Sequence, residues 1–338
     1  MTDVAREANV SAITVSRALR QPDIVSPEVR VRVKDAVDRL GYVPDLAARA
    51  LASARTDIIG VVIPSVTNNV FADVLRGAYS AAEASPFRLQ LGNTRYSPIE
   101  EERLLRVFLS QKPAGLLVTG LDQAAASLGL LKTADCPIVQ IMEYGDSPVD
   151  MLIGLSHREA ARTATRHLIE SGYRRVAFLG ARMDPRTQRR LEGFRDAARV
   201  AGLLDERLIV TTPQASTVGL GGDLLGALLA QAPDADAVFC NNDDLALGAL
   251  FECQRRRISV PHEFGICGFN DLEPAAAAFP SITSVRTFRE AMGRQAVEML
   301  LTRISGAPVV NAKIDIGFEL IRRESTRRFE PAVTQESL

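Results

Sequence analysis

The chain has 338 residues, of which 46% are apolar and 24% are charged, and its formal net charge at pH 7 is −1. This length suits two or three domains, and the composition is that of a soluble globular protein. No apolar run approaches the roughly 20 residues that a membrane helix needs. The first seven residues carry charges of both signs, so they do not read as a secretion signal. These features exclude a membrane or exported protein, and we expect a cytoplasmic protein with no membrane partner.

The residues that usually form metal, cofactor or catalytic sites are sparse. The four cysteines form no CxxC pair, and there are only three histidines. No GxGxxG follows the first predicted strand, and the glycines of residues 219–222 have the wrong spacing for a P-loop. We therefore expect no metal, no cofactor and no enzymatic activity. We interpret His157 and His167 as surface or packing residues.

The apolar pattern of residues 1–43 predicts three short helices. Asn9 lies in a tight turn after the first, where Asn tolerates a positive φ, and Ser11 caps the second helix, residues 12–19. The third helix ends at Gly41. The residues expected to face the core are Val15 and Leu19 in the second helix and Val29, Val33, Val37 and Leu40 in the third. Such an arrangement fits a helix-turn-helix, whose second helix enters the DNA major groove, but it also fits a generic helical bundle.

Short runs of sequence distinguish these alternatives. They are residues 3–5 (DVA), 8–11 (ANVS), 14–19 (TVSRAL), 29–30 (VR), 41–44 (GYVP) and 48–51 (ARAL). Together they closely resemble the DNA-binding head of the lactose-repressor (LacI/GalR) family of bacterial transcription regulators. The resemblance implies that residues 1–43 bind a pseudo-palindromic operator in double-stranded DNA.

The same resemblance assigns roles within the second helix. Ala12, Ile13 and Arg17 occupy its base-reading positions. Arg17 can donate two hydrogen bonds to a guanine, whereas Ala12 and Ile13 can only contact thymine methyl groups or read shape. Thr14 and Ser16 resemble residues that contact phosphates, which set the register on DNA rather than the sequence that is read.

The head departs from the family pattern in two places. The family usually has Gly where Asn9 stands. It also usually has a capping Thr and a core Leu before the DVA run, whereas only Met1 and Thr2 precede it here. We expect that the start codon lies upstream, because the alternative is a frayed first helix. The intact mass of the native protein tests this, and a mass matching Met1 rejects it.

Residues 44–55 form a short, alanine-rich linker. Its helix propensity is high, but about ten residues are too few for a helix that is stable alone in water. An inert linker would explain the composition. The family resemblance implies instead a hinge helix that folds on the operator, with Leu51 wedged into the central base step of the minor groove.

From residue 57 onward, short apolar runs alternate with helical patterns. Strands are predicted at residues 58–63, 88–91, 116–118, 138–142, 176–179, 208–211, 237–240 and 264–268. Helices are predicted at residues 70–84, 99–110, 188–201 and 243–256. Buried strands that alternate with helices predict parallel sheets covered on both faces, and two sets predict two lobes.

The predicted fold is a small all-α helix-turn-helix head joined to an α/β sensor domain of two doubly wound parallel-sheet lobes, similar to periplasmic binding proteins. We expect the chain to cross between lobes near Leu155–Ser156, Ser284–Val285 and Phe318. The predicted boundaries are 1–43 for the head, 44–55 for the hinge, 56–155 and 285–317 for lobe 1, 156–284 and 318–330 for lobe 2, and 331–338 for a tail. The tail has no apolar heptad, so we expect a homodimer rather than a tetramer.

Polar residues collect after four predicted strands, where ligands bind in doubly wound sheets. These loops, at residues 64–71, 180–187, 241–248 and 268–271, resemble the effector-binding loops of the family. Many family members have an Asp at the position of Asn270, so a negative charge is missing here. Arg182 and Arg186 add positive charge beside Asp184, and an arginine fork suits a carboxylate or phosphate. A solvent-facing or Asp184-paired role for the two arginines is the alternative.

Three segments that include these loops, residues 64–77 (PSVTNNVFADVLRG), 180–187 (GARMDPRT) and 239–255 (FCNNDDLALGALFECQR), resemble the gluconate-utilisation repressors within the family. We therefore expect an anionic sugar acid, with gluconate first, and a ketogluconate or a phosphorylated sugar acid remaining open. Arg182 and Arg186 are expected to hold the carboxylate, with Asp184 beside them in the same site, and Phe71 is expected to offer an apolar face. The residues expected to hold hydroxyl groups are Ser65, Glu143, Asn242 and Asn270.

In this interpretation the effector favours one arrangement of the lobes and releases the operator. The sequence does not determine the operator, the regulated genes, or whether the ligand acts as inducer or corepressor. A neutral sugar and a corepressor role are the alternatives within the family. A solute-binding protein would explain the lobes but not residues 1–55.

Overall fold

The computed structural model describes residues 1–20, 22–42 and 56–327. The chain divides into two compact units, Met1–Thr56 and Asp57–Leu338. The predicted hinge and the predicted tail lie outside the described residues. The two units are therefore described separately.

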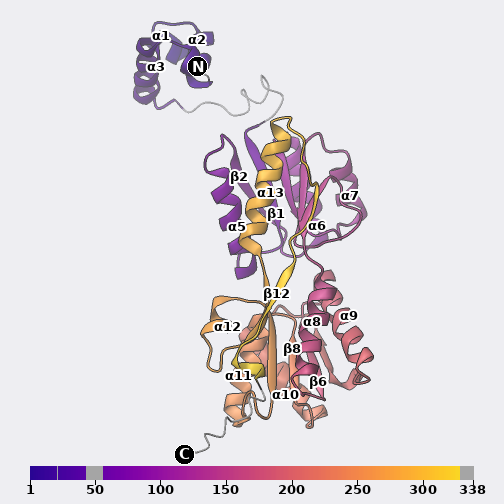
Figure 1. Cartoon of the computed structure of the whole chain (residues 1–338). Helices are drawn as coiled ribbons and strands as arrows, with labels where there is room; N and C mark the ends of the chain where they lie inside the picture. The colour runs from indigo at the N-terminus through magenta and orange to yellow at the C-terminus, as the bar shows by residue number, and fades with distance from the viewer. Residues whose placement is uncertain (21, 43–55, 328–338) are drawn as a thin grey trace, which may run out of the picture. The chain divides into compact units, whose positions relative to one another are not determined.

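The first unit is the expected three-helix head (Figure 1). Its elements are α1 (Thr2–Glu7), α2 (Ala12–Arg20), the 3-10 turn η1 (Pro22–Ile24) and α3 (Pro27–Leu40). Asn9 has the positive φ expected of the tight turn, 49°. The Ser11 hydroxyl accepts a hydrogen bond from the backbone amide of Thr14, so Ser11 caps α2 as predicted. Gly41 ends α3 in the left-handed conformation.

The core of the head differs from the expected one at two leucines. Leu19 is 39% exposed and Leu40 is 47% exposed. In α2 the residue that packs beside buried Val15 is Ala18, three positions later, rather than Leu19. In α3 the buried positions are Val33 and Ala36. Three short helices approach closely enough that small side chains fill the space between them, which turns the larger leucines outward.

The second unit contains two lobes, each built on one sheet. The elements of lobe 1 are β1 (Ile58–Ile63), α5 (Asn69–Ala82), β2 (Arg88–Asn93), α6 (Pro98–Ser110), β3 (Gly115–Thr119), α7 (Ala125–Lys132), β4 (Ile138–Ile141), β5 (Met151–Gly154), α13 (Arg289–Ile304) and β11 (Lys313–Asp315). The elements of lobe 2 are α8 (His157–Glu170), β6 (Val176–Ala181), α9 (Pro185–Val200), η2 (Glu206–Leu208), β7 (Ile209–Thr212), α10 (Val218–Gln231), β8 (Ala237–Cys240), α11 (Asp243–Arg256), β9 (Gly265–Asn270), α12 (Glu273–Ala277), β10 (Thr283–Thr287), β12 (Phe318–Ile321) and η3 (Glu324–Thr326).

Each lobe has a six-stranded, doubly wound sheet, as the alternating pattern predicted. The strand order is β11-β5-β4-β3-β1-β2 in lobe 1 and β12-β10-β9-β8-β6-β7 in lobe 2. The inner strands are parallel and consist almost wholly of buried residues, because helices cover both faces. One strand departs from the prediction: β12 runs antiparallel to β10 at the edge of the second sheet.

The chain crosses between the lobes three times, but one crossing lies later than predicted. β10 pairs with β9 and β12 in the second sheet, so the chain leaves lobe 2 after Thr287 rather than at 284–285. The alternating residues of this strand (TSVRT) gave no continuous apolar run, which is why the strand was not predicted. The other crossings lie between β5 and α8 and between β11 and β12, close to the predicted positions.

Helices α5 and α13 of lobe 1 lie side by side at very short range (Figure 1). A Cβ atom on Gly77 would lie 1.9 Å from the carbonyl oxygen of Glu290, and one on Gly293 would lie 1.9 Å from that of Val74. Only glycine permits this approach of the two backbones. Across the described part of the chain, no helix has the length and apolar character needed to cross a bilayer.

Candidate functional site

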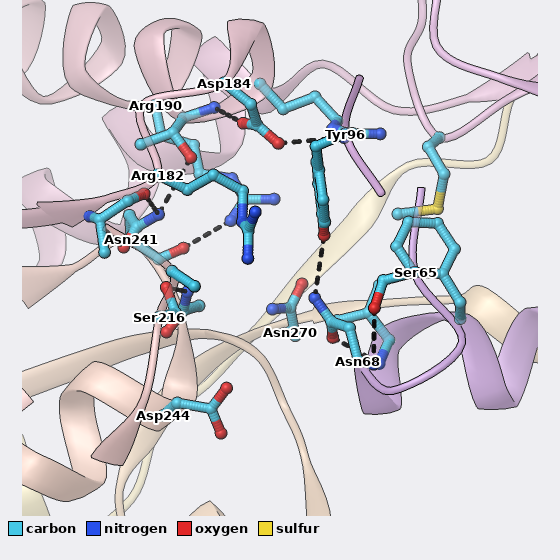
Figure 2. A pocket seen from close by; sticks show the side chains of 18 of the residues that line it. Ser65, Asn68, Tyr96, Arg182, Asp184, Arg190, Ser216, Asn241, Asp244 and Asn270 are labelled. Carbon is cyan, nitrogen blue, oxygen red and sulfur yellow. Dashed lines mark hydrogen bonds and ion pairs between the residues drawn. The ribbon is translucent and has the colours of Figure 1, made fainter. Parts of the chain in front are cut away.

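A polar cavity of about 220 Å³ lies between the two lobes at the carboxyl ends of their strands (Figure 2). Lobe 1 supplies Ser65, Thr67, Asn68, Val70, Phe71, Tyr96 and Met142. Lobe 2 supplies Ala181, Arg182, Asp184, Arg186, Thr187, Arg190, Ala215, Ser216, Asn241, Asn242, Asp244, Asn270 and Leu272. Since both lobes contribute side chains, a ligand held here contacts both and favours one relative arrangement of them.

The cavity brings together most of the residues expected to bind the effector. Ser65, Phe71, Arg182, Asp184, Arg186, Asn242 and Asn270 all line it. Glu143 is the exception, because it is 3% exposed and does not line the cavity. The Arg189 guanidinium holds its carboxylate at 2.6 Å, so Glu143 is not placed to receive a ligand hydroxyl.

Arg182 forms a contact across the cleft with the other lobe. Its guanidinium carbon lies 3.9 Å from the centroid of the Tyr96 ring, within the range of a cation–π interaction. Among the described residues no carboxylate forms an ion pair with it. Both partners have positive φ, 66° for Arg182 and 59° for Tyr96, which is uncommon for such side chains. Strained backbone of this kind clusters at functional sites.

Arg186 is engaged differently from Arg182. Its guanidinium lies 3.0 Å from the carboxylate of Asp184, and both side chains are largely buried. Burial by itself raises the pKa of Asp184, but the charge of Arg186 and the backbone amide of Thr187 outweigh this and hold the pKa well below its usual range. Asp184 is therefore ionised, and it neutralises Arg186, one of the two arginines that were expected to bind the ligand carboxylate.

Arg190, which lines the cavity, belongs to a buried stack in lobe 2. The guanidinium of Arg190 lies 3.7 Å above the ring centroid of Phe269 and donates a hydrogen bond to Nδ1 of His157. Nε2 of His157 lies 2.9 Å from the carbonyl oxygen of Met142, so the ring is neutral, with its proton on Nε2. Burial, and next the charge of Arg190, lower the pKa of His157 well below its usual value, which agrees with this assignment. The histidine packs within the core, as expected.

Burial also shifts the pKa values of the charged groups beside this stack. It raises the pKa of Glu143 to about 7, although Arg189 opposes the shift. It lowers the pKa of Arg190 to about 10. Arg190 therefore remains a cation at neutral pH. Three arginines, Arg182, Arg186 and Arg190, line this end of the cavity together with one carboxylate, that of Asp184, so this end carries excess positive charge.

Amide and hydroxyl groups complete the lobe 2 wall. Asn242 caps α11 through its side-chain oxygen and donates from its side-chain nitrogen to the Ser216 hydroxyl at 2.5 Å. Asn270 has a φ of 109°, and its carbonyl oxygen accepts a hydrogen bond from Arg289. The backbone of Asn270 is thereby held in place while its side chain lines the cavity.

Lobe 1 supplies a smaller and more apolar wall. The Ser65 hydroxyl accepts hydrogen bonds from the backbone amides of Thr67 and Asn68, at 3.2 and 3.1 Å. Asn68 caps α5 and donates to the Tyr96 hydroxyl at 3.3 Å, which links the start of α5 to the Tyr96–Arg182 contact. Phe71 is 2% exposed and presents an apolar surface to the cavity.

A second cavity of about 310 Å³ adjoins the first on the side of α6. The wall between the two consists of Tyr96, Arg182, Asp184 and Arg186, which line both. A change in the Tyr96–Arg182 contact would therefore change the shape of both cavities together.

The head presents the residues expected to read DNA on its surface. Ala12, Ile13 and Arg17 are exposed, and Ile13 is 65% exposed although it is a large apolar residue. Thr14 and Ser16 are half-buried. The predicted wedge residue Leu51 lies outside the described residues. The base-reading and phosphate-contacting roles stay predictions.

Several cavity residues were not predicted from the sequence. Tyr96 follows β2, whose loop shows no motif, and only its place at the carboxyl end of a predicted strand could have identified it. Arg190 and Asn241 lie within or beside segments already singled out. Asp244 follows Asp243 directly, and the sequence does not distinguish the two acids. Within the described ranges, no group of three or more His, Cys, Asp or Glu residues is placed to hold a metal ion.

Comparison with known proteins identifies both units. Residues 1–45 match the model for bacterial regulatory proteins of the lacI family, and residues 165–326 match a periplasmic binding protein-like domain. The HTH-type transcriptional regulator GntR of Pseudomonas aeruginosa is 42% identical over 326 residues, 96% of this chain and 95% of the relative. The regulator of the same name from Escherichia coli is 38% identical over 320 residues, 95% of this chain and 96% of the relative.

Solved structures agree with these matches. A LacI-family transcriptional regulator from Silicibacter pomeroyi has a TM-score of 0.91 at 33% identity, over 97% of this chain and 99% of that one. The transcription regulator GntR from Chromobacterium violaceum has a TM-score of 0.77 at 39% identity, over 80% of this chain and 99% of that one. The predicted fold, a helix-turn-helix head with a two-lobed sensor domain, is confirmed.

Proposed function

The chain belongs to the lacI family of bacterial regulatory proteins, and we propose that it is a transcriptional repressor of sugar-acid utilisation genes that gluconate releases from its operator. The head supports the DNA-binding half of this proposal. The second helix of a helix-turn-helix enters the major groove, and α2 exposes Ala12, Ile13 and Arg17. Two such heads are needed to read a pseudo-palindrome, so we propose a homodimer, which sedimentation would test.

The choice of effector rests on the state of the Arg182 guanidinium. It lines the cavity, stacks on Tyr96 and, among the described residues, has no carboxylate partner. An arginine without a carboxylate partner in a cleft suits the carboxylate of a ligand, because its planar fork matches two oxygens. Since Arg186 is already bound to Asp184, we assign the ligand carboxylate first to Arg182.

The remaining groups suit the hydroxyls of a six-carbon chain. Ser65, Ser216, Asn242 and Asn270 line the cavity and provide both donors and acceptors. The names of the GntR relatives favour gluconate among the sugar acids. By contrast, a neutral sugar would leave the charge of Arg182 without a partner, and a bare apolar effector would leave all these groups unpaired.

Release from DNA requires a coupling between the cavity and the head. A ligand that contacts both lobes shifts the balance between their arrangements, and it lowers operator affinity only if the DNA-bound arrangement holds it less tightly. By linkage, gluconate should then bind the operator complex more weakly than the free protein, by the same factor.

Titration calorimetry with gluconate and glucose, together with operator binding on the DNA upstream of its own gene, tests the proposal. We expect gluconate but not glucose to bind and to weaken operator binding. Arg182→Gln should lose most of the gluconate affinity, whereas Arg199→Gln, an exposed arginine of α9, should not. Equal binding of glucose and gluconate would reject the role of Arg182. Operator affinity that no sugar acid changes would reject the regulatory function.

A further inference from the structure

Two consecutive aspartates begin α11, and their surroundings differ. Asp243 is fully buried, and its carboxylate accepts hydrogen bonds from the Ser284 hydroxyl at 2.6 Å and from the backbone amide of Leu272 at 2.7 Å. Asp244 instead lines the interlobe cavity. Within the described part of the chain, its carboxylate accepts no hydrogen bond and forms no ion pair. Asp243 is therefore hydrogen-bonded within the core of lobe 2, whereas Asp244 faces the cavity.

Asp244 lies at the end of the cavity away from the arginine cluster. Figure 2 shows it well separated from Asp184 and Tyr96, with Ser216 and Asn270 between. The cavity is thus polarised, with unpaired positive charge on Arg182 at one end and an unpaired carboxylate at the other. A ligand with one anionic group has only one orientation that avoids placing like charges together.

We propose that Asp244 is the residue that selects sugar acids with a single anionic group and rejects those with a second anionic group at the far end of the chain. The proposal rests on the proposed function, because it assumes that the ligand carboxylate binds at Arg182. The C6 hydroxyl of gluconate then lies toward Asp244 and donates a hydrogen bond to it. The second carboxylate of glucarate, or the phosphate of 6-phosphogluconate, would instead face Asp244 as a like charge.

The environment of Asp244 favours a hydroxyl donor. Its side chain is partly buried, and this desolvation raises the pKa of the carboxylate. Since no group among the described residues donates to this carboxylate, a ligand hydroxyl can supply a hydrogen bond to it. A second anion in the same place would add like-charge repulsion, which a partly buried site screens less than open solvent does.

Titration calorimetry of the full chain with gluconate, glucarate and 6-phosphogluconate tests this selectivity. In the wild type we expect glucarate and 6-phosphogluconate to bind at least about tenfold more weakly than gluconate, a difference of about 1.4 kcal/mol. Asp244→Asn removes the charge while keeping the size. In this variant we expect the ratio of gluconate affinity to glucarate affinity to fall by about tenfold, because the amide can donate a hydrogen bond to the second carboxylate of glucarate.

Asp223→Asn is the matched control, since it removes an exposed aspartate of the same lobe from α10. It should leave the ratio unchanged. If Asp244→Asn does not fold, Asp244→Ser makes the same comparison, and circular dichroism establishes folding. Equal affinity of the wild type for gluconate and glucarate would overturn the selectivity but leave the proposed function standing. An affinity ratio that is unchanged in the folded variant would also overturn the role of Asp244 and leave the proposed function standing, since the length of the cavity would then cause the discrimination. Failure of gluconate to bind would reject both.

Discussion

Replacing Glu143 with glutamine should make the stability of the protein respond differently to pH. Glu143 is 3% exposed, and burial raises the pKa of its carboxyl group from 4.5 to about 7. The folded protein therefore holds this proton more tightly than the unfolded chain. Between these two pKa values, folding takes up a proton, so the contribution of Glu143 to stability falls as the pH rises.

The magnitude follows from the two pKa values. Each unit of difference corresponds to about 1.4 kcal/mol, and most of the 2.5-unit interval is crossed between pH 5 and pH 8. The wild type should lose about 2 to 3 kcal/mol from this group over that range. Glutamine resembles the protonated carboxyl at every pH and avoids the loss. The stability of Glu143→Gln relative to wild type should therefore rise by about 2 to 3 kcal/mol from pH 5 to pH 8.

Urea unfolding followed by circular dichroism at the two pH values measures this difference. Comparison with the wild type at each pH cancels the contribution of His157 and His167, whose pKa values burial lowers and whose effect on stability therefore has the opposite sign. Glu170→Gln, on the exposed face of α8, controls for loss of a carboxylate. A relative stability that is constant within about 1 kcal/mol, or that falls with pH, would refute the reasoning.

Three further outcomes follow from the described contacts. Tyr96→Leu removes the ring on which Arg182 stacks and should weaken gluconate binding roughly threefold to tenfold in calorimetry; unchanged affinity would show that the contact does not organise the cavity. Gly77→Ala places a methyl group 1.9 Å from a carbonyl oxygen of α13 and should lower the free energy of unfolding by more than about 2 kcal/mol, whereas Gly129→Ala, in open space on α7, should not lower it. Arg17→Ala should weaken specific operator binding roughly tenfold to hundredfold in a gel shift, and an equal loss on unrelated DNA would contradict a base-reading role.

The secondary structure of the sensor domain was predictable where buried runs are continuous. β1, β8 and α11 begin and end at the predicted residues, because a strand covered on both faces is apolar throughout and because α11 begins at a strong capping residue, Asn242. β10 was not predicted, since its alternating sequence lacks this signal. The antiparallel direction of β12 could not be read from the chain at all, because it depends on which sheet edge is free.

The candidate site shows the same division. The loops after β1, β6, β8 and β9 were predicted to meet, since doubly wound sheets bring the carboxyl ends of their strands together. The role of each side chain in the cavity was harder to predict from the sequence. Glu143 was expected among the hydroxyl-binding residues, but Arg189, two residues beyond the 180–187 loop, pairs with its carboxylate, and Glu143 does not line the cavity.

The amino-acid sequence by itself determined the family, the order of the elements and the loops that surround the cavity, because these follow from local motifs and from the periodicity of apolar residues. The tertiary structure decided which charges are free. Arg182 and Arg186 both line the cavity, but only Arg186 is paired with a carboxylate, that of Asp184. Asp243 and Asp244 are adjacent, but only Asp243 is buried and hydrogen-bonded, whereas Asp244 lines the cavity. The physical reason is that pairing and desolvation depend on partners distant in the sequence, and these partners are positioned only when the two lobes have folded.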